Sequence, residues 1–383
     1  SFDLENFADY PAANRKNIAV TDTYEPGSTF KAVTAALALE EGVATLQSGF
    51  FDPGYIRVSG WNVRCWNRGG HGPQSFVETM QNSCNPYYAK LAIDLGPERF
   101  YDGLVRFNLG HKTGIDFPGE MAGILRAPSP SIPLVTWANM GFGQGLTVTP
   151  VQLLACFGAI ANKGIYTPLH YVKELVTEEG SFPPDIPEAR QVIAAEIAET
   201  TAYVLRMAVE RGSGKRAEVP GYDVAGKTGT AQLVEHGRYS HSKMVTSFAG
   251  FAPKDDPKMA ALLVLWEPQG AFYGGIIASP VFARLAEKVL TYLGVERKAT
   301  SRVSQVRQVI VPDVGGLDVE EAAALLRRQQ FRVEVVGPGT RVIGQVPAPK
   351  AEVDVGSLVY IYTDLESGEE VEAAADQPSP YGA

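Results

Sequence analysis

Ser28-Thr29-Phe30-Lys31 stands at the start of a predicted helix that runs from Ser28 to Glu41 and ends before Gly42. Ser28 would lie in the first turn, where free backbone N–H groups and the positive helix dipole favour a developing oxyanion. Lys31 is three residues further on, so both side chains share one helix face. A serine hydroxyl needs a base to become a nucleophile, and a lysine whose pKa is lowered by burial can serve. Alone, the pattern also fits an ordinary helix start.

A second polar motif, Ser83-Cys84-Asn85, follows a predicted helix over 76–82. Pro86 comes next, and we expect it to prevent the helix from continuing at once. On such a loop, Ser83 could relay a proton between the nucleophile, a lysine and the leaving amine. The amide of Asn85 could bind a substrate peptide carbonyl. Taken alone, the tripeptide also fits a simple polar turn.

The third motif, Lys227-Thr228-Gly229-Thr230, lies in the first of three predicted strands separated by turn-rich segments, at 222–233, 244–252 and 259–266. This pattern is typical of an antiparallel meander. Lys227 and the threonine hydroxyls could hold a carboxylate, and Gly229 would let a ligand backbone approach the strand closely. The N–H of Thr230 could complete an oxyanion hole with that of Ser28.

Lys112-Thr113-Gly114 spells the third motif a second time. A turn-rich stretch ending in proline and glycine follows it, over 115–120, and no meander comes after that stretch. We therefore predict that this copy is structural and that Lys227 belongs to the functional motif.

The three motifs, in this order and with their flanking sequence, resemble those of a class B penicillin-binding protein, a peptidoglycan D,D-transpeptidase. The resemblance extends from about Phe2 to Gly294. Its flanking elements are the segments 24–27, 114–120, 141–145, 149–150, 226–232 and 247–251. The cysteine inside the second motif and a single trailing module most resemble the sporulation-specific branch of the family, that of stage V sporulation protein D.

The resemblance implies an α+β fold of the serine β-lactamase/transpeptidase type, in which helices flank an antiparallel sheet. The first strands of that sheet would lie upstream of residue 1. Catalytic roles are implied for Ser28, Lys31, Ser83 and Asn85. Substrate-binding or oxyanion roles are implied for Lys227, Thr228, Gly229 and Thr230.

Further expectations concern partners and location. The resemblance implies peptidoglycan stem peptides as substrates, β-lactam antibiotics as acylating ligands and a wall-synthesis glycosyltransferase as a partner. Family members sit on the extracytoplasmic face of the bacterial cytoplasmic membrane, so the anchor segment would lie outside this chain. We expect no cofactor and no metal, because the five histidines show no metal-ligand spacing. Of these, only His71 is expected near the cleft.

At 383 residues the chain is long enough for one large and one small domain. Its net charge of −9 argues against a nucleic-acid partner, and no apolar run reaches membrane-spanning length. In the second domain, Asp318 is expected to cap a helix with Glu321 completing a capping box. This domain resembles a PASTA module, which could bind wall peptide or, as we favour for a lone copy, pack on the catalytic domain. The predicted boundaries are a transpeptidase domain at 1–295, a linker at 296–308, a PASTA domain at 309–364 and a disordered acidic tail at 365–383.

Four alternative functions remain open on the sequence. The same acylation could be resolved by water, in a D,D-carboxypeptidase or a β-lactamase, although no dedicated carboxylate motif lies between the second and third motifs. The fold could instead serve a β-lactam sensor or a non-catalytic wall-binding scaffold. A Ser-His-Asp hydrolase fits poorly, because no G-x-S-x-G elbow is present.

The chain has three cysteines, so at least one is unpaired. Cys156 is predicted to be a buried core thiol, next to Leu153 and Phe157 on a helix. Cys65 lies in a turn-rich loop over 61–72, and Cys84 lies inside the second motif. Outside the cytoplasm the two could form a disulfide that displaces Ser83 and Asn85, reversed by a thiol reductase. Two free thiols or a permanent bridge are the alternatives.

Overall fold

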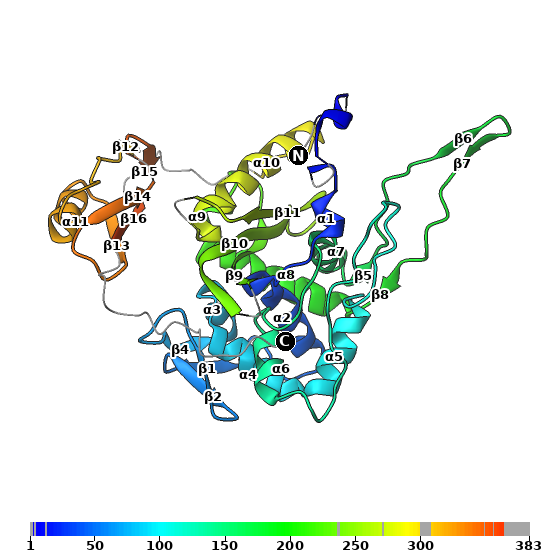
Figure 1. Ribbon diagram of the computed structural model, residues 1–383, viewed down its shortest axis with the longest axis horizontal. Coiled ribbons are helices and arrows are strands. Elements are labelled where there is room, and N and C mark those ends of the chain that lie inside the picture. Colours follow the sequence, from blue (N-terminus) through cyan, green and yellow to red (C-terminus); the bar gives the residue numbers. More distant parts are fainter. Residues whose placement is uncertain are drawn as a thin grey trace. The chain divides into compact units, whose positions relative to one another are not determined.

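An antiparallel sheet of β9 (Ala225–Glu235), β10 (Arg238–Ala252) and β11 (Met259–Trp266) runs through the large unit of the chain (Figure 1). β10 lies between the other two strands and pairs Ser247 with Gly229 on one side and with Val264 on the other. The order is that of the predicted meander. The bounds of β11 and the end of β10 match the prediction, whereas β10 begins six residues earlier and the two ends of β9 shift by two or three residues.

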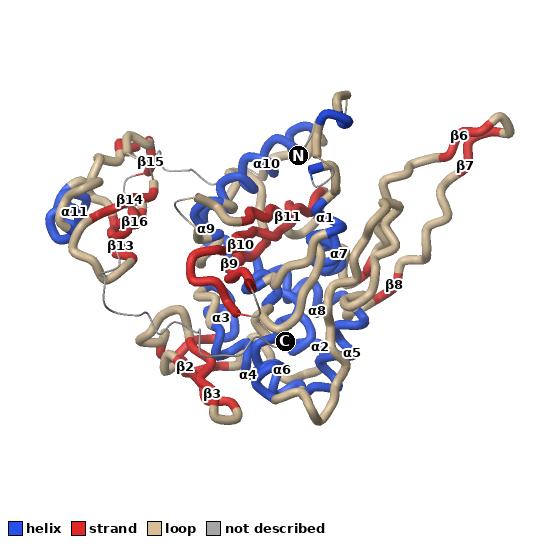
Figure 2. Tube along the Cα trace, in the orientation of Figure 1, coloured by secondary structure: helices blue, strands red, loops and turns tan. Residues whose placement is uncertain are grey.

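The computed structural model describes residues 3, 5–11, 14–235, 238–269, 272–298, 308–347, 349–354 and 356–363. The chain divides into two compact units, and the large one comprises Ser1–Pro268 and Phe272–Arg297. Figure 2 shows helices and strands mixed throughout this unit, in agreement with the predicted α+β class. Within the described residues, the structure contains no helix with the length and apolar character needed to cross a bilayer.

Helices cover both faces of the sheet because its side chains alternate between two apolar clusters. Phe248 and Ala252 of β10 belong to a cluster with Phe282 of α10 (Ser279–Tyr292). The rings of Phe248 and Phe282 lie 4.7 Å apart. Ala249 and Phe251 point to the opposite face and join the main core.

The main core surrounds α2 (Lys31–Glu40), of which every residue through Leu39 is buried. Alanine side chains let this helix approach α4, α5, α7 and α8 closely. The predicted helix from Ser28 needs one correction. Ser28 lies in a short 3-10 turn, Gly27–Phe30, and the α-helix begins only at Lys31.

The second motif connects α3 (Phe76–Gln81) to α4 (Asn85–Leu95). Pro86 was expected to delay the next helix, and this was wrong. It occupies the first turn of α4, where a residue without an N–H is tolerated because that group has no helical partner. The motif therefore lies at a tight junction between two helices.

Two small antiparallel pairs precede α3. One pairs β1 (Gly49–Asp52) with β4 (Gly72–Ser75), and the other pairs β2 (Tyr55–Val58) with β3 (Trp61–Arg64). The segment 61–72, which was predicted to be a turn-rich loop, thus begins with β3. The remaining elements of the large unit are α1 (Ile18–Thr21), α5 (Pro97–Arg106), α6 (Leu134–Met140), α7 (Pro150–Ala161), β5 (Ile165–Tyr166), β6 (Leu175–Thr177), β7 (Gly180–Phe182), β8 (Arg190–Gln191), α8 (Ala195–Glu210) and α9 (Gly274–Ile277).

The second unit has its own apolar core, formed mainly by Leu326, Phe331 and Ile361. Its elements are β12 (Gln308–Ile310), α11 (Val319–Arg328), β13 (Arg332–Val336), β14 (Val342–Val346), β15 (Glu352–Asp354) and β16 (Leu358–Thr363). Asp318 caps α11 as predicted but accepts from the N–H of Glu320, not in a capping box with Glu321. Most of the predicted linker and the predicted tail at 365–383 lie outside the described residues.

Candidate active site

Ser28 lies in a network of hydroxyl and amine groups contributed by three separate segments. Its Oγ is 3.0 Å from the Nζ of Lys31 and 3.0 Å from the Oγ of Ser83. The Lys31 Nζ is also 3.1 Å from the Ser83 Oγ. Ser28 is partly exposed, whereas Lys31 is fully buried. A nucleophile open to solvent therefore rests against a base that water does not reach.

Two acceptors of the second motif hold the Lys31 amine in place, and burial favours its neutral form. Its Nζ lies 2.7 Å from the carbonyl of Ser83 and 2.7 Å from the Oδ1 of Asn85, and both are acceptors. A neutral amine can donate its two hydrogens there and turn its lone pair toward the Ser28 hydroxyl. Burial lowers the pKa of Lys31 to about 7, although the nearby thiols of Cys84 and Cys65 oppose the shift.

Ser83 has a strained backbone conformation in the second motif. Its φ of 55° falls in the left-handed region, which costs a non-glycine residue about 1 kcal/mol. Backbone bonds from Ser83 to Met80 and from Cys84 to Thr79 hold this turn. Such strain is characteristic of functional sites because the surrounding structure must maintain it.

Lys227 of β9 approaches Ser83 from the other side. Its Nζ is 3.0 Å from the Ser83 Oγ and 3.2 Å from the Thr228 Oγ1. Burial, and then the charge of Lys31, holds the pKa of Lys227 well below its ordinary value. An incoming carboxylate would reverse this, because an adjacent negative charge favours the ammonium form.

The third motif lies beside the nucleophile because β9 runs along the 3-10 turn. Gly27 has φ +56°, and a Cβ there would lie 3.1 Å from the Thr230 carbonyl. Gly229 was predicted to let a ligand backbone approach the strand. Any side chain at this position would point into space that other residues of the chain already occupy. A Cβ there would lie 2.4 Å from the Ser247 Oγ and 3.0 Å from Thr29. This glycine is needed for internal packing.

Ser213 was missed by the sequence analysis, which treated residues 212–214 only as a helix stop. Its exposed hydroxyl lies 3.0 Å from the Thr228 Oγ1 and 3.4 Å from the Lys227 Nζ. A serine between two glycines was the only signal, and it is too common to indicate a site.

The other Lys-Thr-Gly copy lies elsewhere. The N–H and hydroxyl of Thr113 both donate to the Glu120 carboxylate, and Gly114 N–H donates to the same group at 3.1 Å. Lys112 is exposed. These contacts close a loop, as expected for a structural segment.

Cys65 and Cys84 are buried free thiols. Their sulfur atoms lie within 4.8 Å of each other and of ligand atoms of Asp52 and His71. Cys156 is also free and fully buried in the main core, as predicted.

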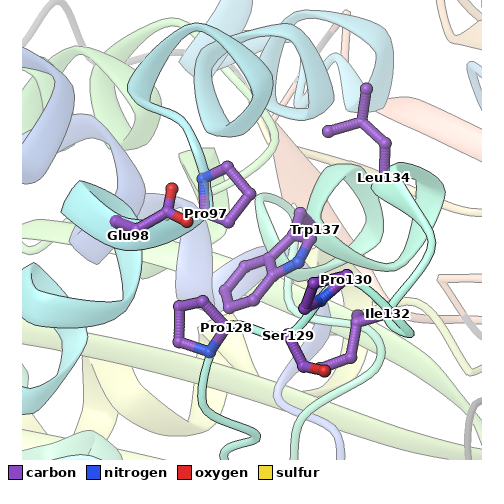
Figure 3. A pocket seen from close by; sticks show the side chains of 8 residues that line it. All are labelled: Pro97, Glu98, Pro128, Ser129, Pro130, Ile132, Leu134 and Trp137. Carbon is purple, nitrogen blue, oxygen red and sulfur yellow. The ribbon is translucent and has the colours of Figure 1, made fainter.

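A cavity of about 300 Å³ lies at the starts of α5 and α6 (Figure 3). It is lined by Pro97, Glu98, Pro128, Ser129, Pro130, Ile132, Leu134 and Trp137. None of these residues belongs to the three motifs.

Comparison with known proteins reveals similar sequences and structures. Stage V sporulation protein D of Bacillus subtilis is 38% identical over 96% of this chain, which spans 58% of that protein. The peptidoglycan D,D-transpeptidase FtsI of Escherichia coli is 32% identical over 78% of this chain and 49% of its own length. The chain therefore spans about half the length of these relatives.

Among solved structures, penicillin-binding protein 3 of Mycobacterium tuberculosis, complexed with ampicillin, is similar with a TM-score of 0.68 and 32% identity. The likeness covers 74% of this chain and 66% of that one. Residues 309–365 match the PASTA domain. Residues 1–287 match the penicillin binding protein transpeptidase domain, and the chain therefore belongs to the penicillin-binding protein transpeptidase family.

Proposed function

We propose that this chain is the catalytic part of a serine-type peptidoglycan D,D-transpeptidase. The observation that carries the proposal is the position of the Ser28 Oγ, 3.0 Å from both the Lys31 Nζ and the Ser83 Oγ. Nucleophile and base are within hydrogen-bond reach, as activation of a serine requires. We further propose the domain limits 1–295 and 309–364, joined by a linker at 296–308.

In the proposed reaction, the Ser28 Oγ attacks the carbonyl of the penultimate D-alanine in a stem peptide. Lys31 accepts the hydroxyl proton, and the tetrahedral oxyanion faces the N–H groups of Ser28 and Thr230. The C–N bond then breaks as Ser83 passes its proton to the departing D-alanine and takes up the proton held by Lys31, which becomes neutral again. The amine of a second stem attacks the resulting ester and gives up a proton to Lys31. As the ester C–O bond breaks, that proton returns to the Ser28 oxygen and the cross-link is complete. Lys227 and Thr228 hold the terminal carboxylate before it leaves.

The acyl-enzyme is expected to resist water. Rapid hydrolysis needs a base that activates a water molecule, and carboxylates commonly serve. Among the described residues, the hydrogen-bond partners of Ser28, Lys31, Ser83 and Lys227 include no carboxylate. This favours a transpeptidase over a β-lactamase.

The experiment that tests the proposal combines a fluorescent penicillin with mass spectrometry of the intact chain. A transpeptidase should carry one stable adduct on Ser28 and should exchange terminal D-alanine for an added amine. Release of hydrolysed antibiotic would indicate a β-lactamase, and D-alanine release without exchange a carboxypeptidase. An unlabelled chain would indicate a scaffold and would contradict the proposal.

Three wider features of the proposal rest on family resemblance. The site would act on the extracytoplasmic face of the cytoplasmic membrane, in sporulation or cell-shape synthesis. A glycosyltransferase would supply the polymerised glycan whose stems are cross-linked. Co-purification of the whole protein with such an enzyme would test this partnership.

Lys227→Ala is predicted to weaken acylation most for substrates that carry a free carboxylate. A charge-assisted hydrogen bond contributes about 1.5–3 kcal/mol, so we expect a loss of roughly 10- to 100-fold. Acylation rates of a carboxylate-bearing β-lactam and an analogue without that group give the measurement. Lys112→Ala is the matched control and should keep the parent rate. Loss in Lys112→Ala alone would show that the other Lys-Thr-Gly is the functional one.

We also propose that Cys65 and Cys84 form a redox pair. In oxidation the two thiols would lose two protons and two electrons to an extracytoplasmic protein disulfide, which becomes a dithiol. A thiol reductase would reverse this by thiol–disulfide exchange. The sulfurs must close to about 2.05 Å, which would pull on the Ser83–Asn85 turn. The oxidised form would then be inactive.

The oxidised chain is predicted to react with penicillin about 100-fold more slowly than the reduced chain, since small misplacements cost that much. Labelling rates would be measured before and after a dithiol reductant. Cys65→Ser should show no difference between the two conditions, whereas Cys156→Ala should keep it. Equal rates in both states of the parent chain would eliminate the switch.

A further inference from the structure

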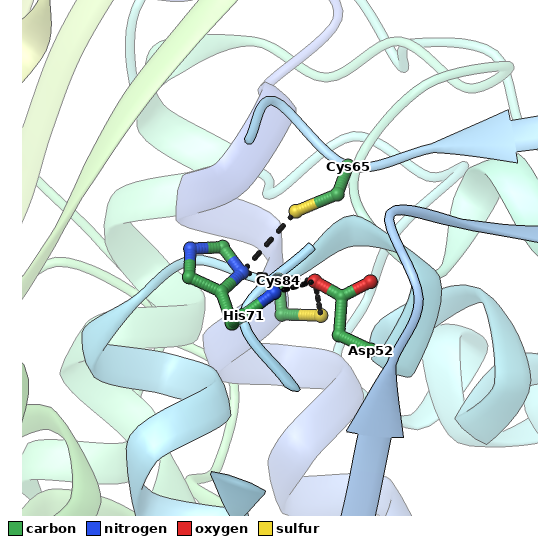
Figure 4. A group of neighbouring side chains, drawn as sticks. All are labelled: Asp52, Cys65, His71 and Cys84. Atoms are coloured by element: carbon green, nitrogen blue, oxygen red, sulfur yellow. Dashed lines mark hydrogen bonds and ion pairs between the residues drawn. The ribbon is translucent and has the colours of Figure 1, made fainter. Parts of the chain in front are cut away.

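Four potential metal ligands converge next to the second motif (Figure 4). They are the Oδ2 of Asp52 at the end of β1, the Sγ of Cys65 after β3, the Nδ1 of His71 before β4 and the Sγ of Cys84 at the start of α4. All four atoms lie within 4.8 Å of one another. Three of the residues are buried, and His71 is half-buried. No metal was expected from the sequence, because the histidines show no metal-ligand spacing; the four residues come from separate elements and meet only in the folded chain.

The distances within the cluster fit one small cation. The Asp52 Oδ2 is 2.9 Å from the His71 Nδ1 and 3.4 Å from the Cys84 Sγ. The Cys65 Sγ is 3.3 Å from the same ring nitrogen. Zinc bonds of about 2.0–2.3 Å at tetrahedral angles place neighbouring donor atoms roughly 3.3–3.8 Å apart. Small side-chain shifts would open the cluster to that size.

We propose that Asp52, Cys65, His71 and Cys84 bind one Zn²⁺ ion in a closed, structural site. Two sulfurs, one imidazole nitrogen and one carboxylate oxygen suit a borderline-soft cation, and they disfavour Mg²⁺ and Ca²⁺, which need oxygen ligands. Four protein donors complete a tetrahedron and leave no open position for catalysis. Binding would release the thiol protons, since thiolates are the ligands.

The backbone around the cluster is already arranged to hold its donors. The second Asp52 oxygen, Oδ1, accepts from the Gly54 N–H at 2.8 Å, which fixes the carboxylate. The N–H of Cys65 donates to the Gly54 carbonyl at 2.7 Å. A Cβ on Gly70 would lie 2.2 Å from the Asp52 carbonyl. Only glycine therefore allows the backbone at residue 70 to pack this closely against that of Asp52. Such outer contacts orient metal ligands.

Zinc binding through Nδ1 requires the tautomer of His71 that carries its proton on Nε2. Its Nε2 is buried and has no hydrogen-bond partner within the described part of the chain. A proton on that nitrogen leaves the Nδ1 lone pair directed at Asp52 and Cys65. Because both Nδ1 neighbours can be anionic, a cation at their centre satisfies all three groups together.

The metal would act on the second motif through Cys84, which lies between Ser83 and Asn85. A zinc–thiolate bond there would fix the start of α4 and, on the proposed function, the positions of both catalytic side chains. Zinc-bound thiolates cannot also form a disulfide. Metal loading would therefore protect the pair against oxidation.

The test measures metal binding, so it does not depend on acylation. The reduced chain is stripped with a chelator, loaded with Zn²⁺ and analysed by native mass spectrometry, and in parallel it is titrated with Co²⁺. We expect one ion per chain, a thiolate-to-Co²⁺ charge-transfer band and the visible spectrum of a tetrahedral site. Replacing a residue that only hydrogen-bonds to a metal ligand lowers metal affinity by roughly 10- to 100-fold. Cys65→Ser, Cys84→Ser and His71→Ala each remove a ligand and should lower the affinity for the metal by more than that.

Matched controls are His111→Ala, which removes an exposed imidazole, and Cys156→Ala, which removes the thiol outside the cluster. Both should bind metal like the parent chain. Failure of the folded, reduced parent chain to bind zinc would overturn the proposal, even if the ligand variants were unstable. Retention of the Co²⁺ thiolate band in Cys65→Ser/Cys84→Ser would overturn it as well. A chain that binds zinc but fails to react with penicillin would contradict only the proposed function.

Discussion

Ser28→Ala is expected to abolish covalent labelling by penicillin, because no other atom at this position can form the acyl bond. The side chain contributes hydrogen bonds to Lys31 and Ser83, at about 1 kcal/mol each. The fold should survive, because α2, which follows the turn that carries Ser28, is held by the apolar core and not by this hydroxyl. Intact-mass spectrometry after incubation with a fluorescent penicillin gives the measurement, and thermal unfolding gives the stability.

Ser131→Ala is the matched control, since it deletes an exposed hydroxyl outside the three motifs. It should label at the parent rate. A folded Ser28→Ala chain that still carried one stable adduct would place the nucleophile elsewhere. The adduct would then be mapped by peptide mass spectrometry, with Ser83 and Ser213 as the first residues to check.

The sequence predicted the parts of the fold that carry strong local signals. β11 has eight consecutive apolar residues between clear turns, and its predicted bounds match. The helix around Pro86 was misread, because the same proline can end one helix or begin the next. The strands β1 to β4 are only four residues long and carry no distinct alternation, so they did not emerge from a pattern.

Contiguous motifs pointed to side chains that the structure brings together, and their catalytic roles stay predictions. Lys31, Ser83 and Lys227 were each found within a short motif, and the structure brings them to one hydroxyl, that of Ser83. Ser213 and Asp52 were not found, because each meets its neighbours only in the folded chain and belongs to no sequence motif. His71 was expected near the cleft, which stays a prediction, and its contacts with Asp52 and Cys65 became visible only in three dimensions.

Lys31→Ala is expected to reduce the acylation rate by about two to four orders of magnitude, the usual contribution of a general base. The lysine also orients the Ser28 hydroxyl, so the loss should fall at the upper end of that range. Only a neutral lysine can act as the proposed base, and burial lowers the pKa of Lys31 to about 7. The parent rate should therefore rise as pH increases through about 7 and level off above it. The second-order rate constant for a fluorescent penicillin, measured across that range, gives the profile.

Two comparisons separate a base from a residue that only supports the fold. Lys90→Ala removes an exposed lysine of α4 that pairs with Asp94, and it should keep both the parent rate and the parent profile. Lys31→Ala should lose the rise near pH 7 as well as the rate, because the titrating amine is gone. If Lys31→Ala kept the rise at a reduced rate, another group would be titrating. Lys227 would then be the next candidate, because its Nζ also reaches the Ser83 hydroxyl, 3.0 Å away.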